Sequence, residues 1–270
     1  MRSGSETVLR SFLVYGPCAW AVVRAVECDL LADVDFKVPV LEIGCGDGEF
    51  ARVLQQVGRK GKFDLGVDIS RREVERARKS GAYKKVKVGD VRKLSLRNGQ
   101  MRTVFSNGAL EHVAGIDAAL REISRVLRRG GRLVFTAPSS YFSSYLFFSR
   151  VFAFLGWKGG MMWYASLING VFVHRNLFDY EEWKRKLERH NLDIVEYCYY
   201  NPAKQVAWCD VLTYLAIPAD LSKWIFGKWV IWKGWRQLVV GAEMKFIRLF
   251  YTTLTSKKEG GSILVVAKKR

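Results

Sequence analysis

The sequence Val40-Leu41-Glu42-Ile43-Gly44-Cys45-Gly46-Asp47-Gly48-Glu49-Phe50 places three glycines at alternate positions directly after a largely apolar run. The apolar run, residues 38–43, predicts a buried strand, and a pattern of apolar residues at helical spacing opens at Glu49. A strand, a glycine-rich turn and a helix together bring a nucleotide-like ligand against backbone N–H groups at a helix N-terminus. Glycine is needed in such a turn because a Cβ would block both the tight turn and the close approach of the ligand.

A second strand with an acidic end follows at the spacing that a nucleotide site needs. Residues 63–68 predict this strand, and it ends in Asp68, twenty residues after Gly48. Such folds hold the two ribose hydroxyls at this position, although a carboxylate here can also simply cap the next helix. Ser70 and Glu73 predict a capping box at the start of that helix.

The next two predicted strands also end in polar segments. Residues 86–88 lead into Asp90, whose carboxylate is placed either to accept from an adenine amino group or to cap the chain locally. Residues 103–105 open into Ser106-Asn107-Gly108-Ala109-Leu110-Glu111-His112. Because parallel strands end at one edge of a sheet, these segments are expected to lie near the glycine turn.

The rest of the core continues the alternation. Apolar residues from Ile116 to Leu127 predict a helix that Gly130 and Gly131 stop, and residues 132–137 predict a fifth strand. Asp179 is expected to cap another helix, and the sequence then predicts two further strands over residues 192–199 and 262–267. Alternating strands and helices with short turns predict an α/β fold with helices on both faces of a mostly parallel sheet.

These motifs resemble those of the class I S-adenosylmethionine-dependent methyltransferases, in their small-molecule and glycan-lipid branch. Leu41–Gly48 is similar to the first motif of that family, Gly66–Asp68 to the second and Gly89–Val91 to the third. Ser106–His112 resembles the "S-N-x-x-L-E-H" segment. The resemblance implies a Rossmann-like, seven-stranded sheet. A dinucleotide site would instead need G-x-G-x-x-G, and the third glycine here falls one residue early.

The resemblance also implies S-adenosylmethionine as the cofactor. The residues implied to bind it come from the glycine turn and from the ends of the second, third and fourth strands: Glu42, Gly44, Cys45, Gly46, Gly48, Asp68, Ile69, Asp90, Val91, Asn107 and Gly108. Glu42 is expected to be buried, hydrogen-bonded to backbone and close to the methionine end of the cofactor. Cys45 is expected to be a small filler of the turn rather than a nucleophile.

Two histidines are the candidates for catalysis. Methyl transfer needs alignment above all, and a base is needed only when the acceptor carries a proton. His112 follows the fourth strand, near the place where the methyl group should emerge, and His174 lies in a segment that resembles an "H-x-R-x-F" element of glycan and lipid methyltransferases. The alternatives are a structural hydrogen bond for His112 and a plain loop position for His174.

Composition narrows the partners without choosing among them. The 270 residues include 44 Lys and Arg against 26 Asp and Glu, which gives a net charge of +18. This excess favours an anionic partner, either nucleic acid or an anionic membrane surface. The five cysteines show no pair at metal-binding spacing, so we expect a reduced, cytoplasmic compartment and no metal site.

We expect a single domain with two aromatic-rich insertions. Its parts are N-terminal helices (1–36), a cofactor-binding core (37–138), a first insertion or lid (139–173), more core (174–200), a second insertion (201–258) and a last strand (259–270). In the second insertion, Trp224, Trp229, Trp232 and Trp235 lie beside Lys223, Lys228 and Lys233 over residues 221–251. This pattern fits either a buried lid or a membrane interface, and it lacks an uncharged run long enough to span a bilayer.

Three functions remain open from the sequence. The first is methyl transfer to a small lipophilic or lipid-linked acceptor at the cytoplasmic membrane face. The second is RNA or DNA methylation, but Ser106–Ala109 differs from the D/N-P-P-Y/F segment that holds a flipped base. The third is a non-catalytic scaffold, which the intact glycines, Asp68 and Asp90 argue against. The sequence does not indicate an oligomeric state.

Overall fold

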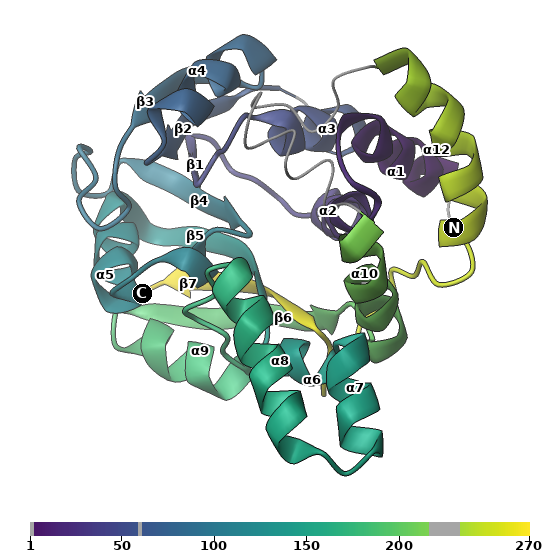
Figure 1. Cartoon of the computed structure of the whole chain (residues 1–270). Coiled ribbons are helices and arrows are strands. Elements are labelled where there is room, and N and C mark those ends of the chain that lie inside the picture. Colours follow the sequence, from purple (N-terminus) through teal and green to yellow (C-terminus); the bar gives the residue numbers. More distant parts are fainter. Residues whose placement is uncertain (1–2, 59–60, 216–232) are drawn as a thin grey trace.

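The structure, a computed structural model, describes residues 3–58, 61–215 and 233–270. Within these ranges the chain forms a seven-stranded sheet in the order β3-β2-β1-β4-β5-β7-β6, with β7 antiparallel to both of its neighbours (Figure 1). The strands are β1 Val40–Ile43, β2 Phe63–Asp68, β3 Tyr83–Val88, β4 Met101–Asn107, β5 Leu127–Pro138, β6 Leu192–Tyr200 and β7 Ser262–Lys269. The predicted fold class, a Rossmann-like and mostly parallel sheet, is confirmed.

The glycine turn follows β1, at the point where the order of the strands in the sheet reverses. The first strand, β1, pairs in parallel with β2 on one side and with β4 on the other. The connections that follow β1 therefore lead to opposite sides of it. In open α/β sheets, ligands bind beyond the carboxyl ends of the strands at such a switch point. The ends of β1, β2 and β4 therefore lie together there.

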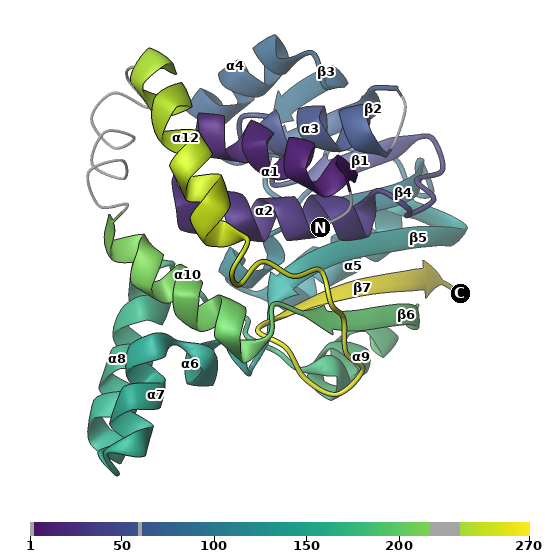
Figure 2. The same ribbon diagram turned by 90° about the vertical axis from the view of Figure 1, so that its right-hand side faces the viewer.

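Alternation along the strands builds two separate cores. Val40 packs with helices on one face of the sheet, while Leu41 packs on the other. The first face is covered by α1 Ser3–Tyr15, α2 Cys18–Leu31, α3 Glu49–Val57, α4 Arg71–Ser80 and α12 Lys233–Ile247. The second face is covered by α5 Ile116–Val126 and α9 Tyr180–Glu188 (Figures 1 and 2).

A third, smaller cluster of helices lies beyond the carboxyl ends of the strands. It consists of α6 Phe142–Tyr145, α7 Phe147–Phe154, α8 Lys158–Val171 and α10 Ala203–Leu215. Leu146, Tyr164, Ile168 and Val206 form its own apolar core. In Figure 2, α7 and α8 extend away from the sheet as a hairpin, with α10 above them. The aromatic-rich residues 139–173 thus form helices outside the sheet.

Two local predictions need correction. The helix predicted to run through Leu127 ends at Val126, because Leu127 already pairs with Met101 of β4 and starts β5. The capping box predicted at α4 is only half formed: the Ser70 side chain accepts from the Glu73 N–H, but the Glu73 carboxylate pairs with Arg76 instead.

Most of the tryptophan-rich part of the second insertion lies outside the described residues, including Trp224, Trp229 and Trp232. The described part, α12, packs against the N-terminal helices, where Arg236 donates to the carbonyl oxygens of Leu13 and Gly16. Among the described residues, no helix is long and apolar enough to cross a membrane.

Candidate functional site

The glycine turn combines two positions that only glycine can fill with one that leaves room for a ligand. All three glycines have positive φ, with values of 68° for Gly44, 50° for Gly46 and 80° for Gly48. A Cβ on Gly44 would lie 2.3 Å from the Cβ of Ala109, and a Cβ on Gly48 would lie 2.5 Å from the Ser80 hydroxyl. A Cβ on Gly46 would meet no atom within 4 Å. Gly46 therefore faces open space, as a turn that receives a cofactor requires.

Asp68 ties this turn to the end of β2. Its carboxylate accepts from the backbone N–H of Gly46 at 2.9 Å and from that of Ser70 at 2.8 Å. A carboxylate has about four acceptor positions, so two remain for the ribose hydroxyls that the resemblance assigns to it. The next side chain, Ile69, is 71% exposed and offers an apolar surface beside the ribose position. These residues fit S-adenosylmethionine.

Glu42 is buried below the turn, but its partner differs from the expected one. The Tyr83 hydroxyl donates to Glu42 Oε2 at 2.8 Å, where a backbone donor was predicted. Burial raises the pKa of Glu42 to about 8, against the lowering effect of that hydrogen bond. Burial also raises the pKa of the Cys45 thiol, which suits a filler of the turn better than a nucleophile.

The end of β3 is less open than the resemblance implies. Asp90 is held by Arg92, whose guanidinium donates to both carboxylate oxygens, and this pairing lowers the pKa of Asp90. Val91 is buried with its side chain in the second core. Asp90 would have to share its carboxylate with an adenine amino group, and Val91 offers only its backbone. Both residues stay predicted cofactor contacts.

Asn107 and Gly108, at the end of β4, connect the glycine turn to a second polar cluster. The Asn107 side chain is buried and donates to Glu27 Oε2 at 3.0 Å. A Cβ on Gly108 would lie 2.6 Å from the Arg24 guanidinium, so that guanidinium rests directly on the backbone of Gly108. The next residue, Ala109, packs on Gly44. Two neighbouring residues, Gly108 and Ala109, thus contact the polar cluster and the glycine turn.

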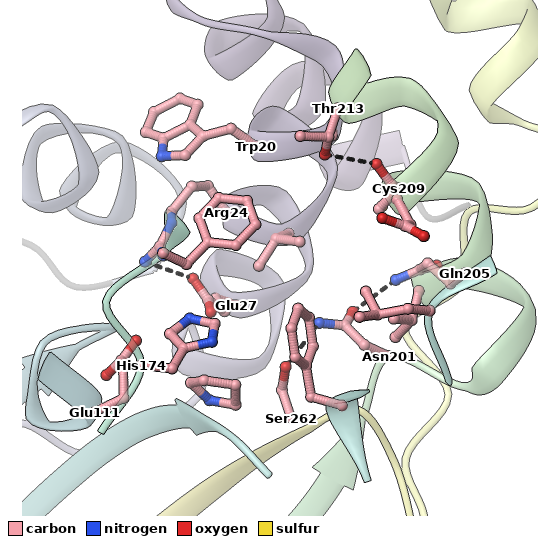
Figure 3. Close-up of a pocket in the computed structure, with 18 of the residues that line it drawn as sticks. Trp20, Arg24, Glu27, Glu111, His174, Asn201, Gln205, Cys209, Thr213 and Ser262 are labelled. Atoms are coloured by element: carbon pink, nitrogen blue, oxygen red, sulfur yellow. Dashed lines mark hydrogen bonds and ion pairs between the residues drawn. The ribbon is translucent and has the colours of Figure 1, made fainter. Parts of the chain in front are cut away.

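The second cluster is built on charged residues of α2. Arg24 Nη1 lies 2.9 Å from Glu27 Oε2, and the Tyr200 hydroxyl donates to Glu27 Oε1 at 3.0 Å. Glu111 lies beside this pair (Figure 3), and burial raises its pKa to about 8. Two buried atoms, Glu111 Oε2 and Arg24 Nε, have no hydrogen-bond partner among the described residues. Unpaired buried polar atoms are costly unless a ligand completes them.

The two predicted catalytic histidines come together in the structure. The His112 and His174 rings lie 5.7 Å apart, centre to centre, and stack. His112 Nδ1 lies 3.2 Å from the Val173 carbonyl oxygen, which can only accept, so Nδ1 carries the proton and Nε2 has a free lone pair. Burial lowers the pKa of both histidines, that of His174 to about 4. Both rings are neutral at neutral pH.

These groups line one cavity of about 380 Å³ between α2, the ends of β4 and β5, the α6–α8 helices and α10. In Figure 3, Arg24, Glu27, Glu111 and His174 gather on one side of the cavity, while Asn201, Gln205, Cys209, Thr213 and Ser262 lie on the other. Apolar side chains supply most of the remaining wall, among them Trp20, Val23, Pro138, Phe142, Leu146, Phe172 and Val206. The cavity suits a small, mostly apolar molecule whose polar groups face these two sides.

Comparisons with known proteins concern the domain that carries the glycine turn. A family model described as a methyltransferase domain matches residues 41–135. Residues 41–135 form a class I S-adenosylmethionine-dependent methyltransferase domain. S-adenosylmethionine is the cofactor of this methyltransferase domain, as predicted.

Individual relatives share the methyltransferase domain rather than their whole length. A malonyl-[acyl-carrier protein] O-methyltransferase of Hamiltonella defensa is 31% identical over 97 residues, which are 36% of this chain and 36% of that protein. A demethylmenaquinone methyltransferase of Symbiobacterium thermophilum is 32% identical over 126 residues, 44% of this chain and 49% of that protein. The chain thus spans about a third to a half of the length of these curated relatives.

The fold extends over nearly the whole chain. The crystal structure of a Thermotoga maritima protein described as an S-adenosylmethionine-dependent methyltransferase superposes with a TM-score of 0.53 at 18% identity. The superposition covers 97% of this chain and 93% of that one. At this identity the likeness establishes the fold alone.

Sequence reasoning missed the contribution of α2 to the site. Arg24 and Glu27 are an i,i+3 pair within a helix that is otherwise largely apolar, and both line the cavity. Two charged residues in a largely apolar helix could have indicated a functional role, because charged residues are rarely buried without a partner or a function. Glu111 lies inside the segment that carried the resemblance, but its burial could not be read from the sequence.

Proposed function

We propose that the protein transfers the methyl group of S-adenosylmethionine to a small lipophilic or lipid-linked acceptor held in the cavity. The observation that carries this proposal is the position of the cavity: it is mostly apolar, and its polar side begins two residues beyond the contact between Gly44 and Ala109. The relative that acts on demethylmenaquinone supports an acceptor of this class.

Alignment is the main contribution that the chain makes. When bound, S-adenosylmethionine supplies a methyl group on a sulfonium, which is already a good leaving group. The turn and the cavity would hold donor and acceptor in line and exclude water, and such alignment contributes on the order of 7–11 kcal/mol. The Arg24 guanidinium, which would lie 2.6 Å from a Cβ on Gly108, brings this side of the cavity against the end of β4.

The unpaired polar atoms would orient the polar end of the acceptor. With a pKa raised to about 8, Glu111 is mostly protonated at neutral pH, so it can donate a hydrogen bond to an acceptor oxygen. Arg24 Nε, which has no partner within the described parts of the chain, is a second donor on the same side. Glu27 is already satisfied by Arg24, Asn107 and Tyr200, and it fixes the guanidinium in place.

His112 is the better placed of the two histidines to accept a proton. Its Nε2 has a free lone pair, and it lies 3.8 Å from Glu111 Oε1, which is too far for a hydrogen bond. His174 packs against Phe142 and Phe172, and its pKa near 4 makes it a weak base. We therefore propose that His112 accepts the proton and that His174 shapes the cavity wall.

A nucleic-acid acceptor is less well supported. Among the residues that line the cavity, Arg24 is the single Lys or Arg, whereas Glu27, Glu111 and Asp210 are acidic. A phosphate backbone needs several cations along its path. The net charge of +18 is better explained by a working position at an anionic membrane surface, which a lipid-linked acceptor would require.

Labelled methyl transfer tests the proposal. The purified protein would be incubated with methyl-labelled S-adenosylmethionine and, separately, with lipid, glycan and RNA extracts, followed by mass spectrometry. We expect label in a lipid-soluble product, and we expect less of it with the Asp68→Ala variant when S-adenosylmethionine is below saturation. Label in RNA alone, or equal label in the variant under these conditions, would contradict the proposal.

A further inference from the structure

The hairpin formed by α7 and α8 is anchored at its base and free at its tip. Asp210 of α10 accepts from the Phe147 N–H at 2.9 Å and from the Tyr164 hydroxyl at 2.7 Å, which joins both helices to the body. Tyr164 and Ile168 are buried on the inner side of α8. The two helices then continue away from the sheet, as both views show (Figures 1 and 2).

The outer side of this hairpin is apolar and exposed. At the tip, Phe154 is 90% exposed, Leu155 67% and Trp157 58%. Along α8, Trp163 is 61% exposed, and Leu167 and Val171 continue the same stripe at four-residue spacing. In α8, apolar residues lie on the covered inner side and also on the exposed outer side. An apolar helix face of this kind is normally buried against another partner. Contiguous exposed apolar surface of this kind marks an interaction site.

Charge indicates which partner fits. The sequence contains no Asp or Glu from residue 123 to residue 178, and the charged side chains on the two helices are the exposed Arg150 and Lys158. An apolar tip that carries tryptophans and cations, and no carboxylates, matches an anionic bilayer surface, where indole rings favour the headgroup level. A water-soluble protein partner would not require that acidic residues be excluded over such a length.

The stripe on α8 leads to the cavity. It continues from Val171 into Phe172, which is itself a cavity wall, and Phe172 stacks on His174. Phe142 and Leu146, from the chain that enters the hairpin, line the same cavity. An acyl or isoprenoid chain could therefore follow apolar side chains from the bilayer to the cavity.

We propose that the α7–α8 tip inserts into the boundary between headgroups and acyl chains of an anionic membrane, and that the acceptor enters the cavity along α8. The entry route rests on the proposed function, whereas the docking itself does not. The docking element is thus the first insertion, independent of the tryptophan-rich residues 221–251.

Vesicle flotation tests the docking with two matched variants of the full chain. The tip variant carries Phe154→Ser and Leu155→Ser, and the control carries Leu249→Ser and Leu254→Ser, which are exposed to a similar degree elsewhere. Vesicles would contain phosphatidylcholine with or without phosphatidylglycerol. Since burying one large apolar side chain changes an equilibrium about tenfold or more, we expect the tip variant to partition at least about tenfold less and the control to match the wild type.

A charge variant, Arg150→Glu with Lys158→Glu, should show a weaker preference for phosphatidylglycerol than the wild type. Equal partitioning of tip and control variants would overturn the proposal, as would failure of the wild type to float. A third result would also overturn it: the wild type does not bind vesicles and forms dimers in sedimentation velocity, and the tip variant does not form these dimers. The tip would then be a contact between two copies. Flotation needs no turnover, so methylation of a lipophilic acceptor by a protein that does not float would leave the proposed function standing.

Discussion

Glu42 illustrates how one buried carboxyl responds to its surroundings. Its side chain is buried and receives a single hydrogen bond from Tyr83, and burial dominates by raising its pKa from about 4.5 to about 8. The folded state therefore holds a proton that the unfolded chain releases above its ordinary pKa. Stability from this group is present below about pH 4.5 and is lost as pH rises toward 8.

We predict that Glu42→Gln removes this loss. Relative to the wild type, the variant should gain about 1–3 kcal/mol in unfolding free energy between pH 5 and pH 8, because glutamine keeps an oxygen for Tyr83 and cannot ionise. Urea denaturation of the cofactor-free protein at several pH values measures the difference. A difference that does not change with pH would show that Glu42 is not the titrating group.

The two histidines can be separated by turnover. For an acceptor that carries a proton, His112→Ala should lower kcat about 10²–10⁴-fold with little change in cofactor affinity. His174→Ala serves as the matched control and should mainly raise KM, since His174 shapes the wall. Because burial lowers the pKa of His112, the wild-type rate should stay constant down to below pH 6.5 and fall only then. A larger kcat effect in His174→Ala would reverse the assignment.

At the scale of elements, sequence patterns predicted most features that depend on local spacing. The glycine turn opens α3 as expected, and Asp179 and Glu182 form a complete capping box at α9. The boundary between α5 and β5 was wrong by several residues, because apolar Leu127 satisfies a helical period and a strand equally well. Its pairing with Met101, a long-range contact, decided the outcome.

Two glycine variants distinguish the effect of backbone strain on stability from the effect of a blocked cofactor site on binding. Gly46→Ala and Gly81→Ala both place a Cβ at positive φ with no atom within 4 Å, so each should cost about 1–2 kcal/mol of stability. Only Gly46→Ala should also weaken binding of S-adenosylmethionine, because only Gly46 faces the cofactor position. Thermal unfolding and calorimetric titration of both variants provide the two measurements. Equal cofactor affinity in both would remove Gly46 from the site.

At the scale of the whole molecule, the acceptor cavity was the part that the sequence could not predict. Its polar side joins Glu27 of α2 to Tyr200 of β6, positions 173 residues apart, through one hydrogen bond. No periodicity reports such a contact. The motif residues could be predicted because they follow strands in sequence, whereas the cavity depends on where α2, α8 and α10 pack relative to one another.

The most direct test of the central claim is calorimetric titration of S-adenosylmethionine into the wild type, Asp68→Ala and a control, Asp193→Ala. Asp193 lies on β6, far from the glycine turn, and pairs with Arg270. Replacing Asp193 should therefore leave cofactor binding unchanged. We predict binding to the wild type and a loss of about 1–3 kcal/mol in Asp68→Ala, since buried ribose hydroxyls would lose a charged acceptor. Absence of binding to the wild type, or unchanged affinity in a folded Asp68→Ala variant, would contradict a cofactor site at the glycine turn.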